Sequence, residues 1–357
     1  AEAMRDSQDL LRDAIERLFS REVNREVLET AEAGAFPAAL WRALEEAGVT
    51  LPSVPGALGG AGGNVLDELV VVRAAGRHAA PVPLPETMLA GWLLTQAKIS
   101  SPEGEMTVAP ASPRDRITLN ADGTLSGRAR VVPFAKAAKH IAVLASDAKG
   151  LSIALVDAAK CRIEAGLNVG GDNSDTVTFD KVAPVTTKPA PKGFDHNALL
   201  LMGGVARSLQ IAGALESLLD ISVRYSNERV AFEKKISKFQ AVQHNLARLA
   251  GESAAALAAA TSAADALSNA TQFNDETFLE AAAAKIRCSE AAEKGSGIAH
   301  QVHGAIGFTS EHILHRYSLR ALAWRDDFGS ESFWAVELGK LIAARGADEL
   351  WPLVASR

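Results

Sequence analysis

The pattern of apolar residues changes twice along the chain, and this change limits the folds that the chain can adopt. Before about Ser100 and after about Phe194, apolar residues recur every three or four positions, which is typical of helices with one buried face. Between Glu105 and Val185, the apolar runs are short, rich in β-branched residues and separated by Asp, Gly and Lys, as strands joined by turns are. The sequence therefore predicts a mainly α fold with a central β domain.

We expect three domains, since 357 residues are enough for several sizeable cores. They are an N-terminal α-helical domain over 1–104, a middle β domain (a small barrel or sandwich) over 105–185 and a C-terminal four-helix bundle over 186–357. Three prolines make the segment Pro184 to Phe194 a predicted linker. Helices are expected near 6–19, 37–47, 65–78, 85–97, 197–223, 238–270, 275–302, 310–323 and 330–345.

Charge, cysteine usage and the length of apolar runs indicate which partners, metal sites and cellular compartments to expect. The formal net charge is −6, and no block of like charge is longer than Lys234-Lys235, so we expect no nucleic-acid partner. Cys161 and Cys288 lie far apart without zinc-ligand spacing, which favours a reducing compartment and no metal site. No run approaches about 18 uncharged apolar residues, so we expect a cytoplasmic protein without membrane insertion.

Two short motifs stand in the C-terminal part of the chain. The first runs from Glu228 to Gln240, with an arginine at Arg229, a phenylalanine at Phe232 and a Phe-Gln pair at its end. The second runs from Gln301 to Glu311 and contains a Gly-Ala-x-Gly-Phe core. Their order and their spacing of about 72 residues are hard to obtain by chance.

These motifs resemble those of the acyl-CoA dehydrogenase superfamily, and the resemblance covers essentially the whole chain. The segment from Trp41 to Gly63 is similar to the family's helix, turn and glycine-rich loop. The segment Ser126-Gly127-Arg128-Ala129-Arg130 is similar to a strand of the family's β domain. The resemblance implies an acyl-CoA dehydrogenase-like fold and an FAD-dependent enzyme that desaturates an acyl-CoA thioester between its α and β carbons.

The resemblance also implies which residues contact FAD, chiefly the FAD of a neighbouring subunit. Arg229 would donate charge-assisted hydrogen bonds to the pyrophosphate, and Phe232 would wall the flavin or adenine. The other residues assigned to the cofactor supply amides, backbone that can approach closely, or a hydroxyl: Gln240, Gln301, Gly304, Ala305 and Ser330. We expect His303, inside the second motif, to be structural.

The family's catalytic carboxylate, which removes the α proton while the β hydrogen leaves as hydride, is missing at its usual place. Phe328-Gly329-Ser330 stands where the family has Glu-Gly-Thr, so Phe328 occupies the position of the base. Asp327, or less favourably Asp326, is the remaining candidate. The alternative position on the first helix of the C-terminal domain holds Asn197, which cannot accept a proton usefully.

Further departures affect the chain's own thioester and flavin contacts. The family's Asp-x-x-Arg reads Asp195-His196-Asn197-Ala198, without the arginine. Two β-domain segments that normally hold the flavin ring read Ala109-Pro110-Ala111-Ser112 and Val131-Val132-Pro133.

Three hypotheses remain open from the sequence. The chain is a self-sufficient homomeric dehydrogenase with Asp327 as base, or one half of a heteromeric dehydrogenase that donates FAD contacts to a partner, or a flavin-free scaffold. For either enzyme, the implied partners are an acyl-CoA substrate, an electron-transfer flavoprotein or similar acceptor, and further subunits, with a tetramer expected first and a dimer second.

Overall fold

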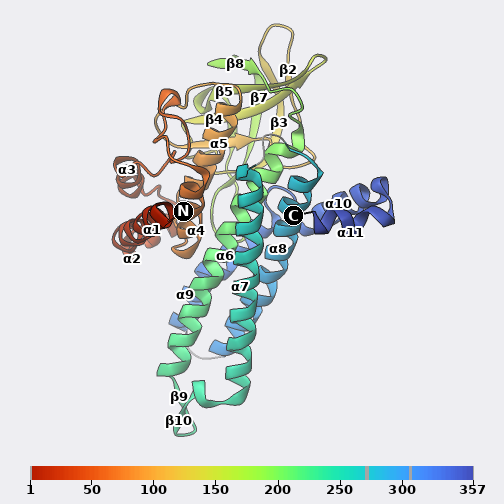
Figure 1. Cartoon of the computed structure of the whole chain (residues 1–357). Helices are drawn as coiled ribbons and strands as arrows, with labels where there is room; N and C mark the ends of the chain where they lie inside the picture. The colour runs from red at the N-terminus through yellow and green to blue at the C-terminus, as the bar shows by residue number, and fades with distance from the viewer. Residues whose placement is uncertain (1, 270–272, 305–307, 357) are drawn as a thin grey trace.

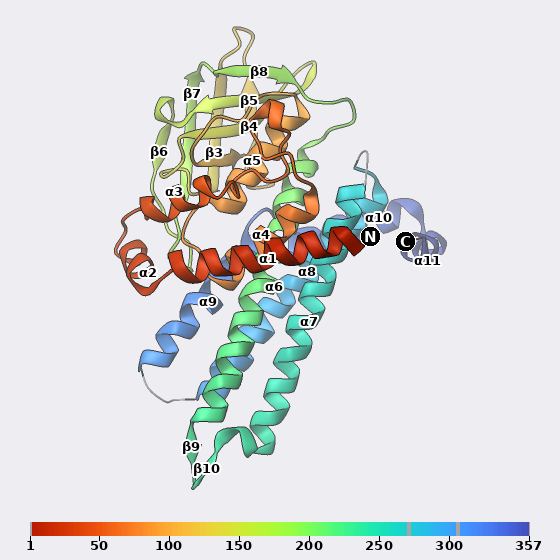
Figure 2. The ribbon, with the colours of Figure 1, turned by 60° about the vertical axis from the view of Figure 1, so that its left-hand side comes forward.

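A computed structural model describes residues 2–269, 273–304 and 308–356 of the chain. Figures 1 and 2 show a β domain at one end, a long helical bundle that extends away from it, and N-terminal helices packed beside their junction. The predicted fold class, mainly α with a central β domain, is confirmed.

The N-terminal part is helical, as predicted, and it contains one helix that the sequence did not reveal. That helix, α2, is short, and it begins where the Asn24 side chain accepts a hydrogen bond from the Val27 amide, 3.0 Å away. The elements are α1 (Glu2–Glu22), α2 (Arg25–Glu32), α3 (Ala38–Glu46), the 3₁₀ turn η1 (Gly56–Leu58), α4 (Val65–Arg77) and α5 (Leu84–Gln96).

The glycine-rich segment between α3 and α4 folds back tightly on itself. A Cβ atom at Gly60 would lie 2.0 Å from the Val54 carbonyl oxygen, so this close approach requires glycine. The segment ends at Asn64, which forms a reciprocal capping box with Asp67 at the start of α4. The loop therefore fixes where α4 begins.

The middle domain is one eight-stranded sheet in the order β6-β7-β3-β2-β4-β5-β8, with β1 paired to β4. Side chains such as Ile117, Val143 and Val177 are fully buried in a core that belongs to this domain alone. The strands are β1 (Met106–Ala109), β2 (Ile117–Leu119), β3 (Leu125–Pro133), β4 (His140–Asp147), β5 (Gly150–Asp157), β6 (Arg162–Glu164), β7 (Ser174–Val182) and β8 (Thr186–Pro189).

The segment Pro184 to Phe194, predicted as a linker, also supplies β8. This strand pairs antiparallel with β5, from Leu155 opposite Thr186 to Ser152 opposite Pro189. Proline is tolerated there because β8 ends the sheet, so its missing N–H breaks no inner ladder. The sheet therefore extends beyond residue 185, the boundary that the sequence predicted.

The C-terminal part is a four-helix bundle of α6 to α9, against which α10 packs through α8. α7 begins at Gln240 rather than 238, because a 3₁₀ turn precedes it. The elements are α6 (His196–Glu228), β9 (Val230–Ala231), β10 (Lys234–Lys235), η3 (Ile236–Lys238), α7 (Gln240–Asn269), α8 (Asp275–His303), α9 (Phe308–Asp326), α10 (Glu331–Arg345), η4 (Ala347–Glu349) and α11 (Leu350–Ala355).

Helix α6 is the central element of the bundle. It is long and apolar enough to cross a membrane, but 89% of its most apolar 18-residue window is buried by the rest of the chain. Its apolar character therefore serves the protein core, whereas a cytoplasmic location stays a prediction.

Ion pairs fasten the three parts to one another. Arg73 and Arg77 of α4 each lie 2.7 Å from the Glu216 carboxylate of α6. Arg320 of α9 pairs at 3.2 Å with Asp172, in the loop before β7, and both side chains are almost fully buried. The N-terminal helices and the β domain are thus each held to the bundle.

Candidate functional site

The first motif forms the end of the bundle farthest from the β domain, where β9 and β10 make a hairpin (Figures 1 and 2). Its two loop residues, Phe232 and Glu233, have φ of +50° and +68°, the left-handed geometry of a tight two-residue hairpin turn. Phe232 is 93% exposed. Arg229 caps α6 through its backbone and is exposed.

The second motif reaches the same end of the bundle. The Tyr225 ring of α6 stacks on His303 of α8 with 4.3 Å between centroids, and its hydroxyl donates to the His303 carbonyl oxygen at 3.3 Å. His303 is 2% exposed and packs between these helices, as expected of a structural residue. Gly304 ends α8 with φ of +61°, a geometry that favours glycine.

The structure therefore places most of the predicted cofactor residues together. Arg229, Phe232, Gln240, Gln301 and Gly304 lie at the hairpin end, and all five are exposed. Ala305 lies outside the described residues.

Ser330 lies elsewhere, in the turn between α9 and α10. Its hydroxyl accepts a hydrogen bond from the Phe333 amide at 3.3 Å and so caps α10. Arg207 of α6, which contacts the neighbouring Asp327, is about 33 Å along the helix from Arg229. The two groups of predicted site residues therefore lie at opposite ends of the bundle.

Asp327, the candidate base, belongs to a buried ion cluster. Its Oδ2 atom lies 2.8 Å from Nε of Arg207, and Nη2 of the same guanidinium lies 2.8 Å from Oε2 of Glu86. The side chains of Arg207, Glu86 and Asp327 are 3%, 2% and 13% exposed. The Arg207 guanidinium thus bridges two carboxylates from different helices and turns.

Burial governs the electrostatics of this cluster. It raises the pKa of Asp327 and of Glu86, although the positive charge of Arg207 offsets part of the effect. For Arg207, burial acts against the charged form, but the two carboxylates outweigh it and raise its pKa. The guanidinium therefore stays charged and keeps both carboxylates engaged.

Phe328 fills the space beside this cluster. It is 2% exposed, its ring lies 5.4 Å from Cζ of Arg207, and a Cβ atom at Gly203 would meet the ring at 2.4 Å. Its φ is +57°, an unusual geometry for a bulky residue. At the position predicted for a catalytic carboxylate, the protein has a packed aromatic ring.

Lys285 of α8 holds the same turn from the other side. Its Nζ atom donates to the carbonyl oxygens of Arg325, Asp327 and Gly329 at 2.7, 2.7 and 2.8 Å. Burial lowers the pKa of Lys285 to about 7. These contacts satisfy carbonyls left over at the end of α9 and fix the turn that carries Asp327.

The other candidate proton acceptors are less favourably placed. The Asp326 side chain is 62% exposed and lies beside Arg325 at 3.4 Å. Asn197 lies in the first turn of α6, where Asp195 caps the helix by accepting from the Ala198 amide at 3.0 Å. Ala198, where the resemblance implies an arginine, is fully buried.

The β-domain segments that would hold this chain's own flavin ring offer few polar side chains. Val131 lies next to a β-bulge with φ of +49° and is 48% exposed. The Pro133 carbonyl oxygen accepts a hydrogen bond from the Thr107 hydroxyl. Across the described ranges, no group of three or more His, Cys, Asp or Glu side chains could hold a metal ion.

Sequence reasoning missed Glu86, Arg207 and Lys285. Each is a charged residue within a buried apolar or alanine-rich stretch of its helix. A charge in such a place must be paired or hydrogen-bonded. That signal was present in the sequence, but the partners could not be identified from it: Arg207 pairs with residues about 120 positions away, and Lys285 with carbonyls 40 to 44 positions away.

Comparisons with known proteins agree with this architecture. The model of the acyl-CoA dehydrogenase N-terminal domain matches residues 5–98, and that of the C-terminal domain matches residues 196–331. Acyl-CoA dehydrogenase IpdE2 of Mycobacterium tuberculosis is 29% identical over 322 residues, which cover 88% of this chain and 91% of that protein.

Two solved structures share the fold over almost the whole chain. The ChsE4-ChsE5 complex of Mycobacterium tuberculosis matches with a TM-score of 0.84 and 22% identity, covering 94% of this chain and 97% of that one. The Tcur3481-Tcur3483 steroid ACAD matches with a TM-score of 0.84 and 26% identity, covering 96% and 99%. The chain belongs to the acyl-CoA dehydrogenase superfamily, a family of FAD-dependent oxidoreductases.

Proposed function

We propose that this chain is one subunit of a heteromeric acyl-CoA dehydrogenase, in which it contacts an FAD seated on a partner subunit. The observation that carries the proposal is the α9–α10 turn, where Phe328 is buried at the position of the base and Asp327 is paired with Arg207. A carboxylate held by a buried guanidinium is poorly placed to take a proton from a substrate. The base would come from the partner.

The hairpin end of the bundle fits FAD. Arg229 presents an exposed guanidinium, which suits the two charges of a pyrophosphate. Gln240 and Gln301 present exposed amides, and the exposed Phe232 ring offers an apolar face. When bound, FAD supplies the acceptor for the β hydride of the acyl-CoA.

The segments that would hold this chain's own FAD and CoA fit these molecules poorly. Val131, Val132 and Pro133 carry no side-chain hydrogen-bond donors, and the arginine expected near the CoA is the buried Ala198. The chain thus keeps the contacts for a neighbour's cofactor and lacks several for its own. The two relatives of known structure whose names join two different chains support a heteromer.

The raised pKa of Asp327 favours a second candidate function. A carboxylate whose pKa is raised by burial is a common form of catalytic base, so a homomeric dehydrogenase that uses Asp327 is the competing proposal. Both proposals include α,β-desaturation of an acyl-CoA, an electron-transfer flavoprotein or similar acceptor, a cytoplasmic location and a tetrameric assembly.

The test is to purify the chain alone and together with a co-expressed homologue that has glutamate at the position of Phe328. We expect the chain alone to be colourless, and the pair to carry FAD and oxidise an acyl-CoA. The variant Asp327→Asn should leave the turnover of the pair within a fewfold of the wild type.

Two results would contradict the heteromer. FAD near one per chain in the protein alone, with turnover that Asp327→Asn abolishes, would establish the homomeric enzyme. Failure of every preparation to bind flavin would instead favour the scaffold.

A further inference from the structure

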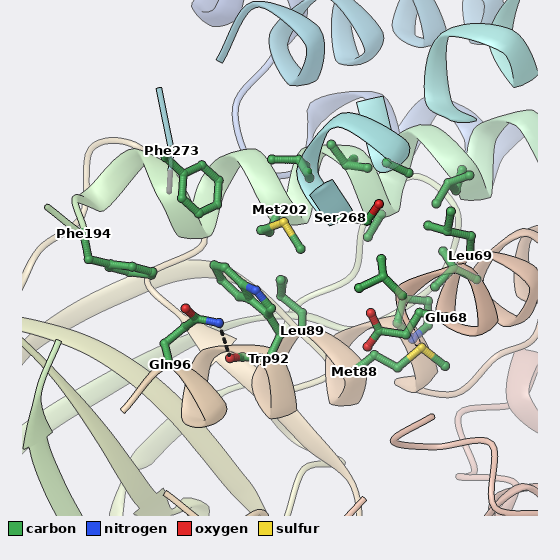
Figure 3. A pocket seen from close by; sticks show the side chains of 18 of the residues that line it. Glu68, Leu69, Met88, Leu89, Trp92, Gln96, Phe194, Met202, Ser268 and Phe273 are labelled. Atoms are coloured by element: carbon green, nitrogen blue, oxygen red, sulfur yellow. Dashed lines mark hydrogen bonds between the residues drawn. The ribbon is translucent and has the colours of Figure 1, made fainter. Parts of the chain in front are cut away.

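A cavity of about 220 Å³ lies between the N-terminal domain and the bundle. Its walls come from α4, α5, α6 and the end of α7 (Figure 3). Most of the lining is apolar, with Leu69, Met88, Leu89 and Met202 among the side chains that face it. The volume exceeds the roughly 150 Å³ of an apolar protein cavity that binds benzene.

Aromatic rings gather at one end of the cavity, as Figure 3 shows. The Trp92 centroid lies 5.8 Å from that of Phe194 and 6.1 Å from that of Phe273. The exposed segment Pro191 to Gly193, which directly precedes Phe194, also lines this end, so the rings stand at the mouth. Flat apolar groups pack well against such rings.

The cavity is separate from the Asp327 cluster. On α6, Met202 and Ala206 face the cavity, whereas Arg207 faces Glu86 and Asp327. Among the described residues, none of these three charged groups lines the cavity. The cluster therefore forms no part of the cavity wall.

Glu68 of α4 is a buried carboxylate at the other end of the cavity from the aromatic rings (Figure 3). It is 9% exposed, and its Oε1 atom is fully buried without a hydrogen-bond partner among the described residues. Burial raises the pKa of Glu68 to about 7, and a hydrogen bond from Ser53 offsets little of this. Two other polar lining groups already have partners, since Gln96 donates to the Trp92 carbonyl and Ser268 to the Asp265 carbonyl.

A buried acceptor without a partner is costly unless something satisfies it. The cavity beside Glu68 has room for a ligand that does so. We propose that this cavity binds a ring-containing apolar ligand whose hydroxyl group donates a hydrogen bond to the Glu68 carboxyl. The rings at the mouth hold the flat apolar part, and Glu68 selects for the hydroxyl.

The test compares two probes that differ in one hydrogen-bond donor. 2-Naphthol has the hydroxyl, whereas 2-methoxynaphthalene has the same ring system and cannot donate. Calorimetric titration of the full-length chain at pH 8, where the Glu68 carboxyl is mostly ionised, should show 2-naphthol binding at least about tenfold more tightly, as one charge-assisted hydrogen bond provides.

Variants locate the site. Glu68→Leu should abolish the advantage of 2-naphthol, Glu68→Gln should keep part of it through the amide oxygen, and the exposed Glu46→Leu should change nothing. Filling the cavity with Ala206→Phe on α6, or with Ser268→Phe on α7, should weaken the binding of both probes.

The wild-type comparison decides the proposal even if a variant does not fold. Equal affinity for the two probes, or binding of neither, would overturn it, as would undiminished binding in both folded cavity-filling variants. Because neither flavin content nor turnover is read in this titration, its failure would leave the proposed subunit role untouched.

Discussion

The two ends of the C-terminal bundle use charged and aromatic residues in opposite ways. At the β9–β10 end, Arg229 and Phe232 are exposed on an end cap and a tight turn. At the other end, Arg207 and Phe328 are buried, and Asp327, whose side chain is 13% exposed, is paired with Arg207. The first arrangement leaves groups available to another molecule, whereas the second makes them part of the protein core.

This difference explains why only one end could be predicted in detail. The exposed residues lie in two short continuous motifs, so their identities and spacing were visible in the sequence. The buried cluster joins Glu86, Arg207 and Asp327, each separated from the next by about 120 residues. A pairing of that kind depends on the tertiary fold, which local patterns do not specify.

The largest effect is expected at the buried end. Arg207→Met should reduce the free energy of unfolding by about 3–5 kcal/mol, because Glu86 and Asp327 would remain buried without their cation. Urea denaturation of the isolated chain measures this. The triple variant Glu86→Gln, Arg207→Met, Asp327→Asn should recover most of the loss, since it leaves no buried charge.

If Arg207→Met leaves the free energy of unfolding unchanged, the contrast between the two ends of the bundle does not hold. That result would mean that the guanidinium is not needed to hold Asp327, and that this carboxylate is free to act as a base. The homomeric proposal would then gain support.

Glu68 shows what burial does to a carboxylate that has no arginine beside it. Its pKa is raised from 4.5 to about 7, so the folded state binds the proton more tightly than the unfolded state does. Wild-type stability should therefore be full below about pH 4.5 and fall as pH rises toward 7. Relative to the wild type, Glu68→Gln should gain about 2.5 kcal/mol in unfolding free energy between pH 5 and pH 8.

The measurement is urea denaturation of both proteins at the two pH values. Glu46→Gln, an exposed substitution on α3, is the matched control and should show no such trend. A difference between wild type and Glu68→Gln that is constant with pH would show that Glu68 is not desolvated in the native protein.

The same distinction applies to the fold: elements set by local sequence pattern were predicted, and elements that depend on tertiary context were not. The long helices were predicted nearly to their ends, because alanine content and three-to-four spacing act along the chain itself. The β8 strand was interpreted as linker because Pro189 argues against a strand, yet proline is acceptable at the edge position that only the sheet order reveals. The eight-residue α2 was missed because a helix so short depends on its Asn24 cap and on packing of Leu28.

At the exposed end, the expected effect falls on the cofactor rather than on stability. Arg229→Ala should weaken FAD binding in the assembled complex tenfold to a hundredfold, roughly the contribution of one charge-assisted hydrogen bond. Stability of the isolated chain should change by less than about 0.5 kcal/mol, since the side chain is exposed. The rate of flavin release on dilution measures the change in FAD binding. The control is Arg224→Ala, which removes an exposed arginine within α6.

The smallest effect is expected at the hairpin turn. Variants there distinguish the backbone geometry of the turn from contact of the Phe232 ring with FAD. Phe232 and Glu233 both have positive φ, which Asn and Gly adopt more readily than Phe and Glu do. Phe232→Asn and Glu233→Gly should therefore each stabilise the isolated chain by about 0.5–1 kcal/mol or less. If the Phe232 ring contacts FAD, only Phe232→Asn should also speed flavin release from the complex. Equal release from both variants would mean that the ring is exposed for another reason, and that the hairpin contributes to FAD binding through Arg229 and the backbone alone.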